Sequence, residues 1–97
     1  MSKSLFICAA AVVVLASSSV QAADEEFCKE YARAAIAQLH EAENHERCDA
    51  FRRRDPARWQ PDFRAHYEWC RNVRRDDAII ERSERSRALD HCAHHDR

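Results

Sequence analysis

Residues 58–62 read Arg-Trp-Gln-Pro-Asp, a typical helix start, since proline is favoured at the first helical position and aspartate in the first turn. The four cysteines that follow residue 22 are arranged around this stretch. Cys28 and Cys92 are centred on residue 60, and Cys48 and Cys70 on residue 59. A chain that turns back here brings each pair face to face. The spacing therefore predicts an antiparallel helical hairpin linked by Cys28–Cys92 and Cys48–Cys70 disulfides.

The composition indicates an all-α protein. The chain has 97 residues and no glycine, although average usage is about seven per cent. Without glycine, phosphate-cradling loops, dinucleotide-binding turns and tight β-hairpin turns lose their usual residue. Alanine, arginine and acidic residues dominate, β-branched residues are few, and no long stretch alternates in polarity. These features exclude the common nucleotide-binding motifs and favour helices.

The first helix is expected to begin after Asp24, a good N-cap. Asn44 is expected to end it, because asparagine tolerates the left-handed conformation that often terminates helices. Its buried face is expected to be a seam of mostly small side chains at helical spacing, which allows a partner helix to approach closely. The residues of this seam are Cys28, Ala32, Ala35, Leu39 and Ala42.

The second helix is expected to run from residue 61 to Cys92, with a kink or an interruption around Asp76–Asp77, where acidic residues interrupt the seam. The expected seam consists of Phe63, His66, Cys70, Val73, Asp77, Ile80, Glu84, Ala88 and Cys92. In the hairpin register, Leu39 lies against Ile80 and Ala32 beside Ala88. The connection, residues 45–60, is expected to be a loop or short helical turn anchored by Cys48, Phe51 and Trp59.

Residues 1–22 resemble a cleaved signal peptide, with Lys3 at the start, an apolar run over 5–16 and small residues before the cleavage point. The apolar run of about 12 residues is shorter than the roughly 20 that span a bilayer. We therefore expect residues 23–97 to be a periplasmic or secreted protein with no transmembrane anchor. Four cysteines in an oxidising compartment predict two disulfides, which a chain this small needs for stability.

The pattern of residues from Cys28 to Cys92 resembles a group of small secreted bacterial four-cysteine proteins or domains of unknown function. The residues that carry the resemblance are Cys28, Tyr31, Ala32, Ala35, Gln38, Asn44, Cys48, Arg58, Trp59, Asp62, His66, Trp69, Cys70 and Cys92. The chain departs from the group between Cys48 and Trp59, where the group has a shorter, glycine-containing connection. The resemblance supports the hairpin and its cysteine pairing, and it implies no activity.

Charge is unevenly distributed along the chain. Residues 47–75 contain nine arginines and four acidic residues, a net charge of +5, whereas residues 23–46 carry −5 and residues 76–97 carry −2. A hairpin would therefore have a basic tip that docks on an envelope protein or an anionic surface. The residues expected to bind are Arg52, Arg53, Arg54, Arg58 and Trp59. The alternative is a solvated loop whose arginines pair with Asp49, Asp55 and Asp62.

The six histidines suggest a second hypothesis. His91, His94 and His95 cluster near the end of the chain, and imidazoles at this spacing chelate zinc, nickel or copper. No acidic or sulfur ligand accompanies them if Cys92 forms a disulfide. Apart from this alternative, no cofactor is expected. We interpret His66 as a packed, hydrogen-bonded histidine between Trp59 and Trp69, because no nucleophile stands at a defined spacing from it.

Catalysis is not expected. The chain has no Cys-x-x-Cys motif, and a two-helix hairpin has little volume for an active-site pocket. Nucleic-acid binding is not expected either, since the arginines are not interleaved with several stacking aromatic residues. The sequence predicts a non-enzymatic binding or structural module, monomeric or homodimeric. The alternative is a small metal-binding or metal-buffering protein.

Overall fold

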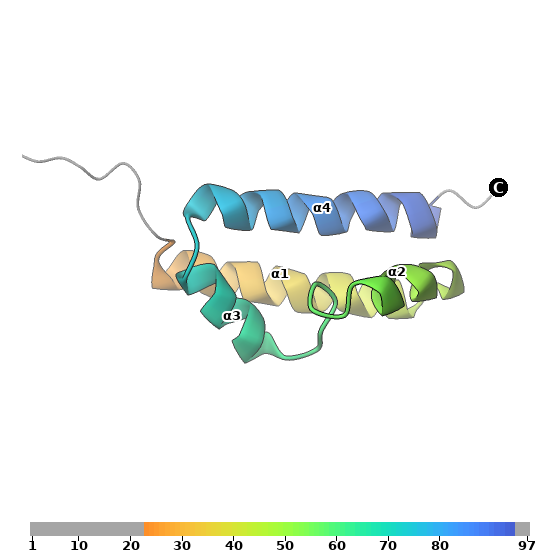
Figure 1. The fold of residues 1–97 in the computed structure, drawn as a ribbon, viewed down its shortest axis with the longest axis horizontal. Coiled ribbons are helices and arrows are strands. Elements are labelled where there is room, and N and C mark those ends of the chain that lie inside the picture. The colour runs from red at the N-terminus through yellow and green to blue at the C-terminus, as the bar shows by residue number, and fades with distance from the viewer. Residues whose placement is uncertain (1–22, 95–97) are drawn as a thin grey trace, which may run out of the picture.

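The computed structural model describes residues 23–94, which carry helices and no β-strand. The elements are α1 (Glu25–Glu43), the short 3-10 helix η2 (Glu46–Cys48), α2 (Asp49–Arg54), α3 (Phe63–Arg71) and α4 (Arg75–His94) (Figure 1). The all-α prediction is confirmed. The predicted signal peptide, residues 1–22, lies outside the described residues, as does His95.

The chain reverses direction twice. Helix α1 contacts each of the other helices, α2 and α3 lead back along it, and α4 then runs beside α1 in the same direction (Figure 1). His94 at the end of α4 lies 3.3 Å from Glu41 near the end of α1, and Ala78 near the start of α4 packs in one cluster with Cys28 near the start of α1. Gln38 contacts Arg82, Arg85 and Ser86 midway between these ends. The long helices are therefore parallel, and the predicted antiparallel hairpin is wrong.

The disulfides join Cys28 to Cys70 and Cys48 to Cys92. Two disulfides were expected, but the predicted pairing of Cys28 with Cys92 and Cys48 with Cys70 is wrong. The reason is the second reversal. It places Cys70 near the start of α1, where α3 ends, and brings Cys92 at the far end of α4 to the end of α1.

Helix α1 follows its sequence signals closely. The Asp24 carboxylate accepts a hydrogen bond from the backbone N–H of Phe27 at 2.7 Å, which satisfies one of the free donors of the first turn. The predicted seam is buried, together with Tyr31. The helix ends at Asn44 as expected, but with φ −83° rather than in the left-handed region.

Helix α3 begins at Phe63, two residues later than predicted. Asp62 is its N-cap and accepts a hydrogen bond from the backbone N–H of Arg64 at 3.0 Å, so Pro61 precedes the helix instead of occupying its first position. At its other end, Asn72 donates to the carbonyl of Glu68 at 2.7 Å. This side-chain bond competes with helix continuation and accompanies the break at residues 72–74.

The break shifts the phase of the buried face of α4. The helix is interrupted, one of the two outcomes predicted around Asp76–Asp77, but the interruption falls at residues 72–74. Asp76 and Asp77 lie in the first turn of α4, where the helix dipole favours negative charge. The buried residues of α4 are Ala78, Arg85, Leu89 and Cys92. Ile80 is 57% exposed, so the predicted contact with Leu39 is wrong.

Two apolar clusters form the core, one at each end of the fold, and each contains the two cysteines of one disulfide. One holds Leu39, Ala42, Cys48, Trp59, Leu89 and Cys92, with Phe51 and Ala88 packed against it. The other holds Ala23, Cys28, Tyr31, Cys70 and Ala78. Ala88 thus packs with the cluster of Leu39, a register different from its predicted place beside Ala32. The prediction that Cys48, Phe51 and Trp59 anchor residues 45–60 is confirmed.

Candidate functional site

The arginine-rich segment, residues 47–59, forms η2, α2 and the turn that follows. It is not the tip of a hairpin, because η2 contacts both α1 and α4 near their C-terminal ends (Figure 1). The segment contains five arginines and two aspartates, a net charge of +3. The structure therefore places this positive charge along the side of the molecule, next to α4.

The arginines of α2 differ in their surroundings. Arg52 donates to the Asp49 carboxylate at 2.8 Å, as the solvated-loop alternative expected. The Arg54 guanidinium lies 4.9 Å from the centroid of the Phe51 ring, a cation–π contact. Arg53 is exposed, and within residues 23–94 its side chain has no hydrogen bond or ion pair. Arg53 and Arg54 thus keep donors that a ligand can use.

Arg58 has a mainly structural role. Its Nε and Nη2 donate to the two oxygens of Glu81 at 2.6 and 3.1 Å, and its Nη1 lies 3.7 Å from Asp55. The hydrogen bond with Glu81 raises the pKa of Arg58 above its usual value, against the opposing effect of burial. Arg58 therefore connects the turn after α2 to α4.

Trp59 is 5% exposed and packs in the apolar cluster of Leu39 and Leu89. It was expected to bind a partner at the surface. The structure instead buries its ring, and part of the ring lines a hollow between α2 and α4.

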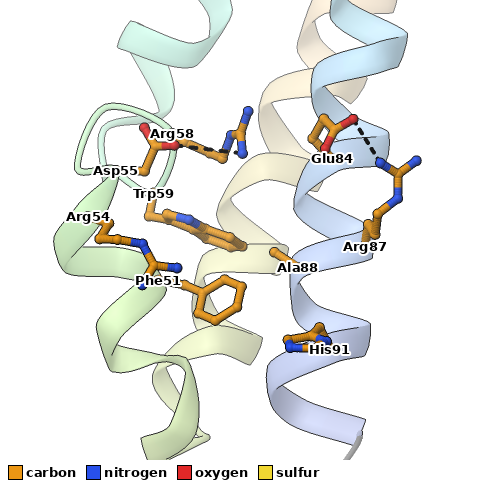
Figure 2. A pocket seen from close by; sticks show the side chains of 9 residues that line it. All are labelled: Phe51, Arg54, Asp55, Arg58, Trp59, Glu84, Arg87, Ala88 and His91. Atoms are coloured by element: carbon orange, nitrogen blue, oxygen red, sulfur yellow. Dashed lines mark hydrogen bonds and ion pairs between the residues drawn. The ribbon is translucent and has the colours of Figure 1, made fainter.

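A groove of about 360 Å³ lies between α2 and α4; we call it the α2–α4 groove (Figure 2). Arg54 and Arg87 stand on opposite sides of it, with the rings of Phe51 and Trp59 between them. Arg87 donates to Glu84 at 3.0 Å, and the ring of His91 lies 5.9 Å from that of Phe51. The residues that line the groove are Phe51, Arg54, Asp55, Arg58, Trp59, Glu84, Arg87, Ala88 and His91.

A second hollow lies on the other side of Arg58; we call it the Arg85 pocket. The residues that line it are Tyr31, Asp55, Ala57, Arg58, Gln60, Ala65, His66, Trp69, Glu81 and Arg85. The Arg85 guanidinium lies 5.0 Å from the centroid of the Tyr31 ring. Burial raises the pKa of Tyr31, while the hydrogen-bonding and charge effects of Arg85 act in the opposite direction.

His66 is a buried, hydrogen-bonded histidine, as predicted. Its Nε2 lies 2.8 Å from the carbonyl oxygen of Gln60, and because a carbonyl only accepts, Nε2 carries the hydrogen. Its ring meets Tyr31 edge-on, with centroids 6.5 Å apart. Burial lowers the pKa of His66, although the bond to Gln60 acts against this. The imidazole is thus held neutral.

His91 and His94 lie in different surroundings. His94 lies 3.3 Å from the Glu41 carboxylate, and its ring is 6.3 Å from that of His45. His91 instead lies at the α2–α4 groove. Over the part of the chain that the structure describes, no three histidine, cysteine, aspartate or glutamate side chains converge on a metal position. Because His95 lies outside that part, the predicted metal site stays a prediction.

The sequence reasoning missed Glu81, Arg85 and Arg87, and it did not identify Tyr31 as a pocket residue. The continuous second helix placed Glu84 and Ala88 on the buried face, whereas the break at 72–74 rotates Arg85 inward. Asn72, with its tendency to bond its own helix, was the signal available for that break.

A comparison of the chain with protein-family models, with curated proteins and with solved structures finds no match. Within residues 23–94, none of the helices has the length and apolar character needed to cross a membrane.

Proposed function

We propose that this protein is a small exported binding module, without catalytic activity of its own, which docks an acidic segment of a partner protein in the α2–α4 groove. The two disulfides support an oxidising location. The observation that carries the proposal is the pairing of an aromatic floor with arginines on both sides of the groove (Figure 2).

The aromatic rings that line the α2–α4 groove suit an apolar side chain of a partner. The rings of Phe51 and Trp59 line the groove beside the methyl group of Ala88. Aromatic and arginine side chains dominate the energetically important parts of protein interfaces, where a side chain enters a desolvated pocket. A leucine or phenylalanine side chain of a partner fits this chemistry.

The arginines beside the groove suit acidic residues next to that apolar side chain of the partner. Arg54 and Arg87 frame the groove, and Arg53 is exposed on the same helix as Arg54. A partner carboxylate that reaches Arg54 gains a charge-assisted hydrogen bond while Arg54 keeps its contact with Phe51. This combination favours a protein segment over a lipid surface, because headgroups do not bring an apolar side chain into a groove of this shape.

The proposal is tested by selecting random peptides on the disulfide-intact protein by display. Selected peptides are expected to combine aspartate or glutamate with leucine or phenylalanine. Arg54→Glu is expected to weaken their binding at least ten-fold. The matched control is Arg33→Glu, at an exposed arginine on α1 that pairs with Glu30, and it should leave binding unchanged.

Three results contradict the proposal: selected peptides without acidic residues, equal binding to Arg54→Glu and Arg33→Glu, or binding to phosphatidylserine vesicles with no selectable peptide. The last result would favour a lipid surface instead.

A further inference from the structure

A buried guanidinium lies between the two core clusters. Arg85 is 1% exposed, its Nε donates to Gln38 Oε1 at 2.7 Å, and its Nη1 lies 3.5 Å from the carbonyl oxygen of Arg58. The guanidinium also lies 5.0 Å from the centroid of the Tyr31 ring, and among residues 23–94 its Nη2 has no hydrogen-bond partner. Buried polar groups in native proteins are nearly always hydrogen-bonded, so an unpartnered guanidinium nitrogen calls for an explanation.

The charge of Arg85 is also incompletely neutralised. The nearest carboxylate is Glu81, but both oxygens of Glu81 accept from Arg58 at 2.6 and 3.1 Å. Arg85 Nη1 is left with a longer contact of 3.6 Å to Glu81. A buried cation is stable when an anion and further hydrogen bonds compensate it. Arg85 therefore lacks one hydrogen-bond acceptor, at Nη2.

The Arg85 side chain lines a hollow with aromatic walls. The Arg85 pocket has a volume of about 260 Å³. The rings of Tyr31 and Trp69 lie 5.6 Å apart at an angle of 33°, and both line this pocket. Trp69 is 41% exposed, so one wall of the pocket reaches the protein surface.

We propose that the Arg85 pocket binds a small aromatic monocarboxylate, whose carboxylate accepts from Arg85 and whose ring packs against Trp69. A carboxylate supplies the missing acceptor and the missing negative charge together. A cavity of about 150 Å³ already admits a benzene ring, so this pocket has room for a ring with a carboxylate. This site and its ligand are separate from the peptide groove and do not depend on it.

The lining also defines what the pocket excludes. The lining contains two carboxylates, Asp55 and Glu81, and both pair with Arg58. One additional carboxylate supplies the acceptor that Arg85 Nη2 lacks, whereas a phosphate dianion is repelled more strongly by Asp55 and Glu81. Selectivity for a monoanion over inorganic phosphate is therefore expected.

The probe for the test is benzoate, titrated into ¹⁵N-labelled, disulfide-intact protein and followed by NMR. The expected result is a saturable shift of the Arg85 Nε–H and Trp69 indole N–H signals. Benzamide, the neutral analogue, should bind at least ten-fold more weakly, and inorganic phosphate should leave both signals in place.

Two variants link binding to the pocket. Arg85→Lys keeps the charge but removes Nη2, and is expected to weaken benzoate binding at least ten-fold. Trp69→Ala changes a half-exposed side chain, carries the test if Arg85→Lys fails to fold, and should weaken binding by a similar factor. Arg82→Lys, at an exposed arginine on the same helix that lines neither hollow, is the matched control and should bind like wild type.

The proposal is overturned by the absence of saturable shifts up to about 20 mM benzoate, well above a millimolar dissociation constant. It is also overturned if the shifts are confined to the α2–α4 groove, or if Trp69→Ala binds as tightly as Arg82→Lys.

Discussion

Arg58 and Glu81 form a two-point ion pair, with Nε–Oε2 at 2.6 Å and Nη2–Oε1 at 3.1 Å, between the turn after α2 and the middle of α4. The side chains are 29% and 22% exposed, so solvent screens this pair less than it screens a surface pair. The pair separates the α2–α4 groove from the Arg85 pocket, because Arg58 lines both.

We expect the Arg58–Glu81 pair to stabilise the fold measurably. A double-mutant cycle with Arg58→Ala and Glu81→Ala should give a coupling energy of about 1–2 kcal/mol in urea unfolding. Arg33 and Glu30, whose side chains are 55% and 67% exposed, supply the control pair, with an expected coupling below about 0.5 kcal/mol. Equal coupling for the two pairs would show that Arg58 does not hold the turn on α4.

The core register is tested by two substitutions of similar chemistry. Leu39 is 3% exposed in the cluster with Trp59 and Leu89, so Leu39→Ala should lower the free energy of unfolding by about 2–4 kcal/mol. Ile80 is 57% exposed, and Ile80→Ala should change it by no more than about 0.5 kcal/mol. A large loss from Ile80→Ala would restore the hairpin register, which places Ile80 against Leu39.

Stability is expected to fall in mild acid because of His66. Burial lowers its folded-state pKa below the ordinary value of 6.5, so the unfolded chain takes up a proton at a higher pH than the folded protein. The resulting penalty is absent above about pH 6.5, grows as the pH falls through that value, and is complete below the folded pKa.

Urea unfolding at about pH 7.5 and about pH 5 measures this effect. His66→Gln, which keeps a donor for the Gln60 carbonyl, should lose less stability over this interval than wild type. His40→Gln, at an exposed position on α1, should behave like wild type. An unchanged pH dependence in His66→Gln would assign the effect to other groups.

The two disulfides should contribute nearly equally to stability. They join residues that are 42 and 44 positions apart in the sequence. In the chain-entropy model, closing a loop of either length stabilises the folded state by about 4 kcal/mol. The double variants Cys28→Ala/Cys70→Ala and Cys48→Ala/Cys92→Ala should each lose a similar amount of unfolding free energy and retain no free thiol. With the hairpin pairing, each variant would break both disulfides and leave two thiols.

Local sequence signals predicted the local structure well. Asp24, the small seam of α1 and the end of that helix at Asn44 all depend on neighbouring residues, and the structure confirms them. The anchoring of residues 45–60 followed from Cys48 and the aromatic residues near it. Helix content and boundaries in this chain are therefore largely encoded within one or two turns of sequence.

The topology was not predictable in the same way, because the cysteine positions fit two arrangements. The four positions are symmetric about residue 59 or 60, which suits a hairpin, but Cys70 and Cys92 also follow Cys28 and Cys48 by nearly constant intervals of 42 and 44 residues. A constant interval is what two parallel helices produce. Only the break at residues 72–74 decides between the two arrangements, and it contains neither glycine nor proline.

The candidate sites show the consequence of that error. The arginine-rich segment was identified from charge alone, but its partner across the groove, Arg87, depends on the parallel register. Arg85 was missed because a continuous helix turns it away from the core. A long polar side chain at a buried position is a tertiary feature, and propensity and hydrophobic periodicity do not select it.

The parallel arrangement of α1 and α4, on which both sites depend, is tested most directly by tryptic mapping of the disulfides without reduction. From Cys28 to Cys92, lysine or arginine occurs between every two successive cysteines, so each of these four cysteines falls in its own peptide. The account predicts that the peptide ending at Lys29 is linked to residues 65–71, and residues 48–52 to residues 88–97. A link between the Cys28 peptide and residues 88–97 would contradict it.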